Sequence, residues 1–242
     1  MLLEATDVSK AFGRFLAVSG ASLSVSAGEI VGLIGPNGAG KSTFFNCVAG
    51  DSAPTTGRIV FDGADLTRAS PEAHALAGIG RTFQVPATFE DMTILENVMV
   101  GAFLRHSRRG EARERALEVI EMSKLHEHIH RSARSLGTPG RKRLEIARVL
   151  ATRPRLILLD EALAGLTPSE IKDAIELVRN IHRSGITIVI VEHIMDVIMS
   201  LADRVLVFHQ GKVIASGKPD EVTRDEAVIE AYLGRKLRAA RP

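Results

Sequence analysis

The stretch from Gly35 to Thr43, Gly-Pro-Asn-Gly-Ala-Gly-Lys-Ser-Thr, decides the fold of this chain of 242 residues. Its spacing fits the phosphate-binding pattern G-x-x-x-x-G-K-S/T, in which glycines let backbone N–H groups turn inward around an anion. The pattern is informative because the sequence predicts an apolar strand before it, over 29–34, and a helix after it, over 41–49. The chain is therefore expected to have an α/β fold with a phosphate-loop nucleotide-binding core.

Each part of this loop has an expected role in holding the phosphates of a nucleotide. The helix that begins near Lys41 directs its unpaired N–H groups and the positive end of its dipole at the anion. Lys41 is expected to reach the β- and γ-phosphates, and the Ser42 hydroxyl to coordinate Mg²⁺. ATP and Mg²⁺ are thus the expected cofactors. The predicted loop residues are Gly35, Asn37, Gly38, Ala39, Gly40, Lys41, Ser42 and Thr43.

A second stretch, Leu156-Ile-Leu-Leu-Asp160-Glu161, is expected to complete the site. Its four aliphatic residues predict a buried strand that ends at Asp160, which would reach Mg²⁺ directly or through a water. Glu161 follows at once and is placed to orient or deprotonate an attacking water. This pair predicts ATP hydrolysis rather than binding alone.

The rest of the core shows short aliphatic strands that alternate with helical patterns. Strands are predicted over 58–61, 156–159 and 186–191, and helices over 168–183 and 193–201. This alternation favours a mostly parallel sheet covered by helices on both faces. The segment 204–215, with its turn at Gln210-Gly211, predicts a hairpin that forms an antiparallel edge of the sheet.

Residues 92–136 lack strand signals and carry Glu, Arg, His, Leu and Ala at helical spacing, which predicts a helical lobe inserted into the core. The charge run over 105–115 is expected to be a solvated helix face. The predicted domain boundaries are 1–91 for the first part of the core, 92–140 for the lobe, 141–234 for the second part of the core and 235–242 for a basic tail.

Composition excludes several classes of protein. The net charge of +2 gives no field that would attract nucleic acid, so no nucleic-acid partner is expected. Cys47 is the single cysteine and suits a reducing compartment. No apolar run is long enough to cross a bilayer, and the first residues show no signal peptide. The chain is expected to be cytoplasmic and to meet a membrane only through another protein.

At this point the sequence resembles the ATPases of the ABC transporter family over essentially the whole chain. By that resemblance, Phe12 would stack on adenine, with Val18 as a second wall. Gln84 would contact Mg²⁺ and relay the nucleotide state to a transmembrane permease partner. Residues 164–167 would touch an opposing ATPase subunit, and His193 would contact the γ-phosphate.

Within that family, three stretches are similar to the ATPase of branched-chain amino-acid importers. They are 78–84, 93–101 and 230–234. The resemblance implies uptake of branched-chain amino acids or related small amides, driven from the cytoplasmic face of the plasma membrane. It further implies transmembrane permease subunits, a second ATPase subunit and, indirectly, an extracytoplasmic substrate-binding protein.

One segment departs from the family pattern. The signature Leu-Ser-Gly-Gly-Gln, which caps the nucleotide of the partner subunit, is replaced by residues 136–140, Leu-Gly-Thr-Pro-Gly. Gly137 lacks the hydroxyl of the family serine, and Pro139 has no N–H to donate. Thr138 can supply a hydroxyl one position late or can N-cap the following helix, and the capping role is favoured.

This departure predicts two unequal sites in an ATPase dimer. The chain's own loop, Asp160, Glu161 and His193 are intact, whereas its signature segment is a poor cap for the partner's nucleotide. A heterodimer with a second, different ATPase subunit is the arrangement that suits this asymmetry, although a homodimer stays open. Two other classes also stay open: a soluble ABC protein outside transport, and a phosphate-loop kinase for a small molecule.

Overall fold

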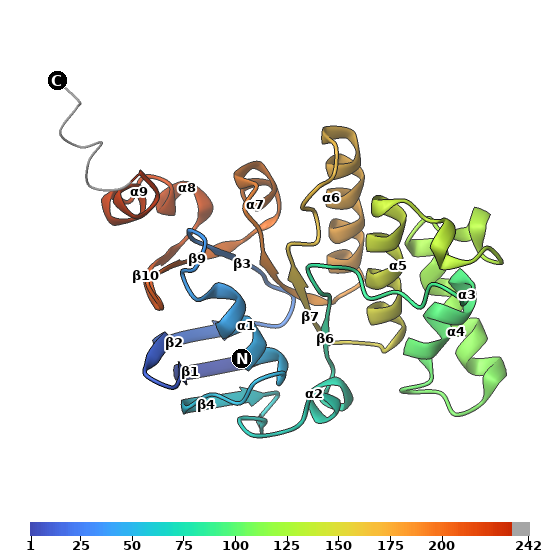
Figure 1. Cartoon of the computed structure of the whole chain (residues 1–242), viewed down its shortest axis with the longest axis horizontal. Helices are drawn as coiled ribbons and strands as arrows, with labels where there is room; N and C mark the ends of the chain where they lie inside the picture. Colours follow the sequence, from blue (N-terminus) through green and yellow to red (C-terminus); the bar gives the residue numbers. More distant parts are fainter. Residues whose placement is uncertain (234–242) are drawn as a thin grey trace. The chain divides into compact units, whose positions relative to one another are not determined.

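The computed structural model describes residues 1–233, and the predicted tail over 235–242 lies outside them. The chain divides into two units, each with its own packing (Figure 1). Of the described residues, the first unit contains 1–74 and 187–233, and the second contains 75–186. The predicted boundaries between core and lobe stay a prediction.

An antiparallel sheet occupies the first part of the first unit, at the blue end of the chain in Figure 1. Its strands are β1 (Leu3–Phe12), β2 (Phe15–Val25), β4 (Thr56–Phe61) and β5 (Ala64–Asp65), in the order β2-β1-β4-β5. Sequence analysis predicted β4 alone. The alternation of buried Ala21, Leu23 and Val25 with exposed residues is the period-two signal that would have predicted β2.

The predicted parallel strands form the other part of this unit. Strand β3 (Ile30–Ile34) pairs in parallel with β8 (Thr187–Val191) on one side and with β9 (Arg204–His209) on the other. Strand β10 (Lys212–Gly217) pairs antiparallel with β9, which confirms the predicted edge hairpin. Every residue of β3 and β8 is buried, as expected for strands covered on both faces.

Helix α1 (Lys41–Ala49) begins and ends where the sequence predicts. Gly50 terminates it in the left-handed conformation, with φ of 84°, and donates its N–H to the Cys47 carbonyl oxygen. Phe44 is fully buried and its ring lies 5.2 Å from the ring of Phe208 on β9, so the helix that follows the loop is anchored on the sheet. The other helices that fall in or reach this unit are α2 (Pro71–Ala77), α7 (Met195–Leu201), α8 (Pro219–Val222) and α9 (Glu226–Leu233).

The second unit pairs β6 (Ile79–Arg81) in parallel with β7 (Leu156–Asp160). Helices α5 (Thr138–Ala151) and α6 (Pro168–Arg183) belong to the same unit. Gly80 lies so close to α5 that a Cβ there would come within 2.5 Å of Val149. The strand that leads toward Gln84 is therefore packed directly on the helix that follows the signature segment.

The predicted helical lobe is confirmed as helical. It contains α3 (Ile94–Ala102), α4 (Arg109–Met122) and the short 3-10 turns η1 (His126–His128) and η2 (Ala133–Ser135). Helix α3 begins with a capping box between Thr93 and Glu96 and packs against both α4 and α5. The lobe is thus continuous with α5 rather than a separate body.

The charge run over 105–115 is only partly the solvated face that was predicted. Most of its side chains are exposed, but Arg105 donates to the carbonyl oxygens of Leu76 and Thr152. Arg115 is half-buried and donates to the carbonyl oxygen of Leu150 at 2.8 Å. The prediction of a solvated face does not hold for these two arginines. Their long side chains donate hydrogen bonds to backbone carbonyl groups near the ends of neighbouring helices.

Histidine 74 gives the fold an expected sensitivity to acid. His74 is buried, and burial lowers the pKa of its imidazole below 6.5 because the charged form loses hydration. The folded chain therefore binds fewer protons here than the unfolded chain, and the stability that this gives is lost as pH falls from about 6.5 through the folded-state pKa. We expect the melting temperature to drop more between pH 7.5 and 5.5 in the wild type than in His74→Leu. Equal drops in a thermal-unfolding series would contradict this.

Candidate functional site

The glycine-rich loop lies between β3 and α1 and has a backbone that only glycine permits at two positions. Gly35 has φ of 144°, and a Cβ there would lie 2.1 Å from the carbonyl oxygen of Phe208. Gly40 has φ of 99°, and its Cβ would lie 2.5 Å from the carbonyl oxygen of Ala17. The spacing of these glycines in the sequence is therefore a requirement of the fold at this turn.

The turn between β9 and β10 supports the glycine-rich loop through backbone hydrogen bonds. Gly211 donates its N–H to the carbonyl oxygen of Ala39 at 2.9 Å and accepts from the N–H of Ser19 at 2.8 Å. Ala39 in turn donates to the carbonyl oxygen of Pro36 at 3.2 Å. A loop fixed in this way keeps its shape before a ligand binds, which lowers the entropy that binding must overcome.

Lys41 is buried, with 4% of its surface exposed, and is folded back onto the loop. Its Nζ donates to the carbonyl oxygens of Gly35 at 2.8 Å and Pro36 at 3.1 Å. Gly40 is the N-cap of helix α1, without a side-chain cap, and the first turn of the helix has no acidic residue. The ammonium group of Lys41 and the backbone N–H groups at the start of α1 are hydrogen-bond donors, and no acidic side chain in the first turn repels an anion. This set of donors fits the phosphates of a nucleotide. Ser42 and Asn37 are exposed at this loop, and Thr43 is half-buried.

The two residues expected to contact adenine differ in their surroundings. Phe12 ends β1 opposite Phe15, and 55% of its surface is exposed, so a flat ring can stack on it. The Nζ of Lys10 lies 5.3 Å from the centre of the Phe12 ring. Val18 is fully buried behind Gly40, so its side chain offers no surface to a base. Val18 lies beside the loop, and its role as a second wall for adenine stays a prediction.

His193 follows β8 in the same unit and is exposed, in the turn before α7. Buried Glu192 separates it from the strand. An exposed imidazole at the carboxyl end of a parallel strand is in the position where ligands of α/β sheets bind.

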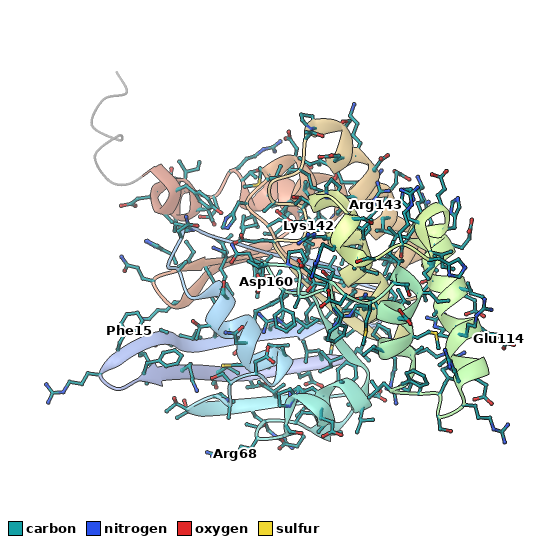
Figure 2. The ribbon with its side chains drawn as sticks, turned by 45° about the vertical axis from the view of Figure 1, so that its right-hand side comes forward. Phe15, Arg68, Glu114, Lys142, Arg143 and Asp160 are labelled. Atoms are coloured by element: carbon teal, nitrogen blue, oxygen red, sulfur yellow. The ribbon has the colours of Figure 1, made fainter. Side chains whose placement is uncertain are left out.

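Asp160 ends β7 in the second unit, and Figure 2 labels it there. Its side chain is buried and accepts a hydrogen bond from Arg81 on β6, with 2.9 Å between Nη2 and Oδ2. The N–H of Asp160 donates to the Thr82 hydroxyl at 3.2 Å. Sequence analysis predicted Asp160 but missed Arg81 and Thr82, although both stand within three residues of the predicted Gln84.

The structure brings Glu161 and Gln84 together. The Nε2 of Gln84 donates to the Glu161 carboxylate at 2.6 Å, and Lys142 on α5 donates to the Glu161 carbonyl oxygen at 3.0 Å. Glu161 has φ of 48°, in the left-handed region that residues other than glycine seldom adopt. Strained backbone of this kind persists where surrounding contacts hold it, often at functional sites. The hydrogen bonds from Gln84 and Lys142 help to hold Glu161 in this conformation.

Helix α5 holds the backbone on both sides of Gln84, through charged residues that sequence analysis did not single out. Glu145 accepts from the N–H of Phe83 at 3.1 Å and is also hydrogen-bonded by the N–H of Ala87. Burial raises the pKa of the Glu145 carboxyl above its usual value, and these backbone N–H groups act in the opposite direction. Arg148 donates to the carbonyl oxygen of Ala87, and its guanidinium lies 4.6 Å from the centre of the Phe89 ring.

The signature segment is built differently from the prediction. Helix α5 starts at Thr138, and Gly137 is its N-cap, without a side-chain hydrogen bond. The N-cap role predicted for Thr138 is therefore wrong, because Gly137 is extended, with ψ of 175°, and the helix begins one residue earlier. The predicted loop over 164–167 leads into α6, where Thr167 forms a capping box with Glu170.

Among residues 1–233, no group of three or more His, Cys, Asp or Glu side chains could hold a metal ion. Mg²⁺ in nucleotide sites commonly takes only one or two protein ligands and completes its coordination with phosphates and waters. The carboxylate of Asp160 and the hydroxyl of Ser42 suit that ligand chemistry.

A glycine-rich loop follows one parallel strand and precedes a helix, and another parallel strand ends at Asp160, directly before Glu161. These features define a phosphate-loop nucleotide-binding protein. The ABC transporter family matches residues 18–164, and the branched-chain amino acid ATP-binding cassette transporter family matches residues 212–236. The chain belongs to the ABC transporter family. It is an ATPase subunit of an ABC importer, as predicted.

Relatives match almost the whole chain. The high-affinity branched-chain amino acid transport ATP-binding protein BraF of Pseudomonas aeruginosa is 38% identical, over 96% of this chain and 98% of the relative. LivG of Salmonella typhimurium, with the same description, is 40% identical over the same shares. Among solved structures, a nucleotide-free ATP-binding cassette from an ABC transporter superposes with a TM-score of 0.88 at 33% identity, covering 97% of this chain and 99% of that one. This match confirms the predicted fold class.

Proposed function

We propose that the chain hydrolyses Mg-ATP at the cytoplasmic face of the membrane to drive uptake of branched-chain amino acids or related small amides. The observation that carries the substrate class is the likeness, over 96% of the chain, to proteins described as branched-chain amino acid transport ATP-binding proteins. The family match over 212–236 supports the same class. No helix among the described residues is long and apolar enough to span a bilayer.

The residues of the loop bind the phosphates in this proposal. Lys41 exchanges its contacts with Gly35 and Pro36 for the β- and γ-phosphates, and the first N–H groups of α1 complete the anion site. Ser42, Asp160 and Gln84 are the proposed protein contacts of Mg²⁺. When bound, Mg²⁺ neutralises charge on the phosphates and supports phosphoryl transfer. Phe12 supplies an exposed ring for the adenine.

Glu161 orients the attacking water and takes its proton, while His193 and Gln84 respond to the γ-phosphate. The 2.6 Å hydrogen bond from Gln84 fixes the Glu161 carboxylate in one orientation, which is the preorganisation that a general base requires. Closure of an ATPase dimer would bring this machinery to the nucleotide, with the energy coming from tighter binding to the closed state. A related cassette, 26% identical with a TM-score of 0.81, is described as a dimer bound to ADP and phosphate.

The partner ATPase is proposed to be a different subunit. Gly137 at the start of α5 has no hydroxyl, and Pro139 in the first turn has no N–H, so the signature segment has fewer donors than Leu-Ser-Gly-Gly-Gln. Because Gly137 is the N-cap, the Thr138 hydroxyl is not used for capping, which favours the alternative that it contacts the partner's nucleotide. A lost donor to transition-state charge costs about 3 kcal/mol, or about hundredfold in rate, so the two sites would turn over unequally.

The permease is proposed to dock beside the segment that follows Gln84. A groove of about 150 Å³ lies here, lined by β6, α3 and α5. Two exposed apolar side chains line the groove, Phe83 and Val100. Nearby in the sequence, Val85, Phe89 and Phe103 are exposed as well. Exposed apolar side chains concentrated in one short segment suit a protein contact. Glu145 and Arg148 hydrogen-bond the backbone of this segment on either side of Val85.

Reconstitution tests this function. ATP hydrolysis by the purified chain is expected to be low, and to rise when the second ATPase, the permease subunits and the substrate-binding protein are added in vesicles with labelled leucine. Uptake should depend on ATP, and no phosphorylated small molecule should form. A phosphorylated acceptor would identify a kinase instead. Unchanged ATP hydrolysis with all partners present would favour an ABC protein outside transport.

A further inference from the structure

Arg81 forms an ion pair that the proposed mechanism does not use. Its guanidinium and the Asp160 carboxylate are 2.9 Å apart, and only 12% and 8% of the two side chains are exposed. A carboxylate removed from water in this way is destabilised unless a cation or several hydrogen-bond donors compensate it. Arg81 therefore supplies a countercharge for Asp160.

The same carboxylate is the proposed ligand of Mg²⁺. Two cations that share one carboxylate a few ångströms apart repel each other strongly where water is excluded. Arg81 also occupies Oδ2, one of the two oxygens that Asp160 can offer to a metal. The guanidinium and the metal thus compete for Asp160 in two ways: their positive charges repel each other, and both bind the carboxylate oxygens.

Arg81 has space into which it can withdraw. It lines the groove of about 150 Å³ together with Phe83, Glu145 and Arg148. Its guanidinium already lies 5.3 Å from the centre of the half-exposed Phe83 ring, a face that accepts a cation. The buried carboxylate of Glu145 on the same groove would compensate part of its charge.

The segment that carries Arg81 also restrains the second carboxylate. Gln84, three residues later, donates to Glu161, and Thr82 between them accepts from the N–H of Asp160. One short stretch, residues 81–84, therefore holds the carboxylates of both Asp160 and Glu161.

We infer that Arg81 is a positioning residue that holds Asp160 in the nucleotide-free chain and competes with Mg²⁺ for it. Asp160 exchanges the guanidinium for the metal when Mg-nucleotide binds, and Arg81 moves toward the groove. This inference rests on the proposed role of Asp160 as a metal ligand.

The test uses Mg²⁺ and fluorescent ADP with the purified full chain, and the variants Arg81→Met and Arg81→Lys. Arg81→Met should melt below the wild type when nucleotide-free, and saturating Mg-ADP should remove most of that difference. The Mg²⁺ concentration that half-saturates ADP binding should fall about tenfold, since the charge that opposes the metal is gone. Arg81→Lys keeps a positive charge but has fewer fixed hydrogen-bond donors. Its melting temperature and its Mg²⁺ requirement should therefore lie between those of the wild type and Arg81→Met.

Arg58→Met is the matched control, because Arg58 forms an exposed ion pair with Asp65 at 2.8 Å; it should leave the Mg²⁺ dependence unchanged. A purely structural role would lower the melting temperature equally with and without Mg-ADP, and this result would overturn the inference. An unchanged or higher Mg²⁺ requirement in both Arg81 variants would do the same. If the wild type itself binds no Mg-ADP, the proposed function fails first; if it binds and the variants match it, only the inference fails.

Discussion

Glu161→Gln is expected to lower ATP turnover of the assembled transporter by about hundredfold or more, while Mg-ATP binding is kept. The amide has nearly the shape of the carboxylate and can keep a hydrogen bond with Gln84, but it cannot take a proton from water. Positioned general bases contribute about 10²–10⁴ in rate, so the loss should be of that size. Phosphate release under steady-state conditions measures it, and equilibrium nucleotide binding checks that the site is intact.

Glu114→Gln is the control for this change, because Glu114 is an exposed residue of α4. The unequal sites inferred from residues 136–140 also predict that the same change has different effects in the two ATPase subunits. If the partner is a different subunit with a complete signature, Glu161→Gln should cost far more turnover than the matching change in the partner. Equal losses from the two single variants would count against unequal sites, and full activity of Glu161→Gln would remove Glu161 from the mechanism.

Lys41→Met is expected to weaken Mg-ATP binding by about hundredfold, which corresponds to about 3 kcal/mol. The buried ammonium contributes charge-assisted hydrogen bonds to the phosphates, and methionine fills similar volume without a donor. The variant also loses the contacts of Nζ with Gly35 and Pro36, so its melting temperature must be measured beside its affinity. Lys172→Met, at an exposed position of α6, is the matched control and should bind as the wild type does.

The parts of the site that could be predicted from sequence are those whose geometry is local. The loop from Gly35 to Gly40 and the helix from Lys41 to Ala49 follow from glycine requirements and periodicity within fifteen residues. The position of Asp160 follows likewise from an apolar strand that ends in a charge. The edge hairpin at Gln210-Gly211 was found for the same reason.

The parts that could not be predicted depend on residues far apart in the chain. The pairing of Arg81 with Asp160 spans 79 positions, and the support of Phe83 by Glu145 spans 62. No local sequence pattern predicts either contact. The one available signal is that Glu145 is a charged residue among the apolar residues on the buried face of α5. Thr138 failed as the N-cap because Gly137 is itself a tolerable cap residue, so the helix start shifted by one residue.

The central claim is that the loop from Gly35 to Thr43 binds the phosphates of a magnesium nucleotide. Calorimetric titration of the purified chain with Mg-ATP, set beside the same titration of Lys41→Met, tests it most directly. The account predicts one bound nucleotide per wild-type chain and a large loss of affinity in a folded Lys41→Met. A wild-type chain that takes up no nucleotide, or a variant that binds as tightly as the wild type, would contradict it.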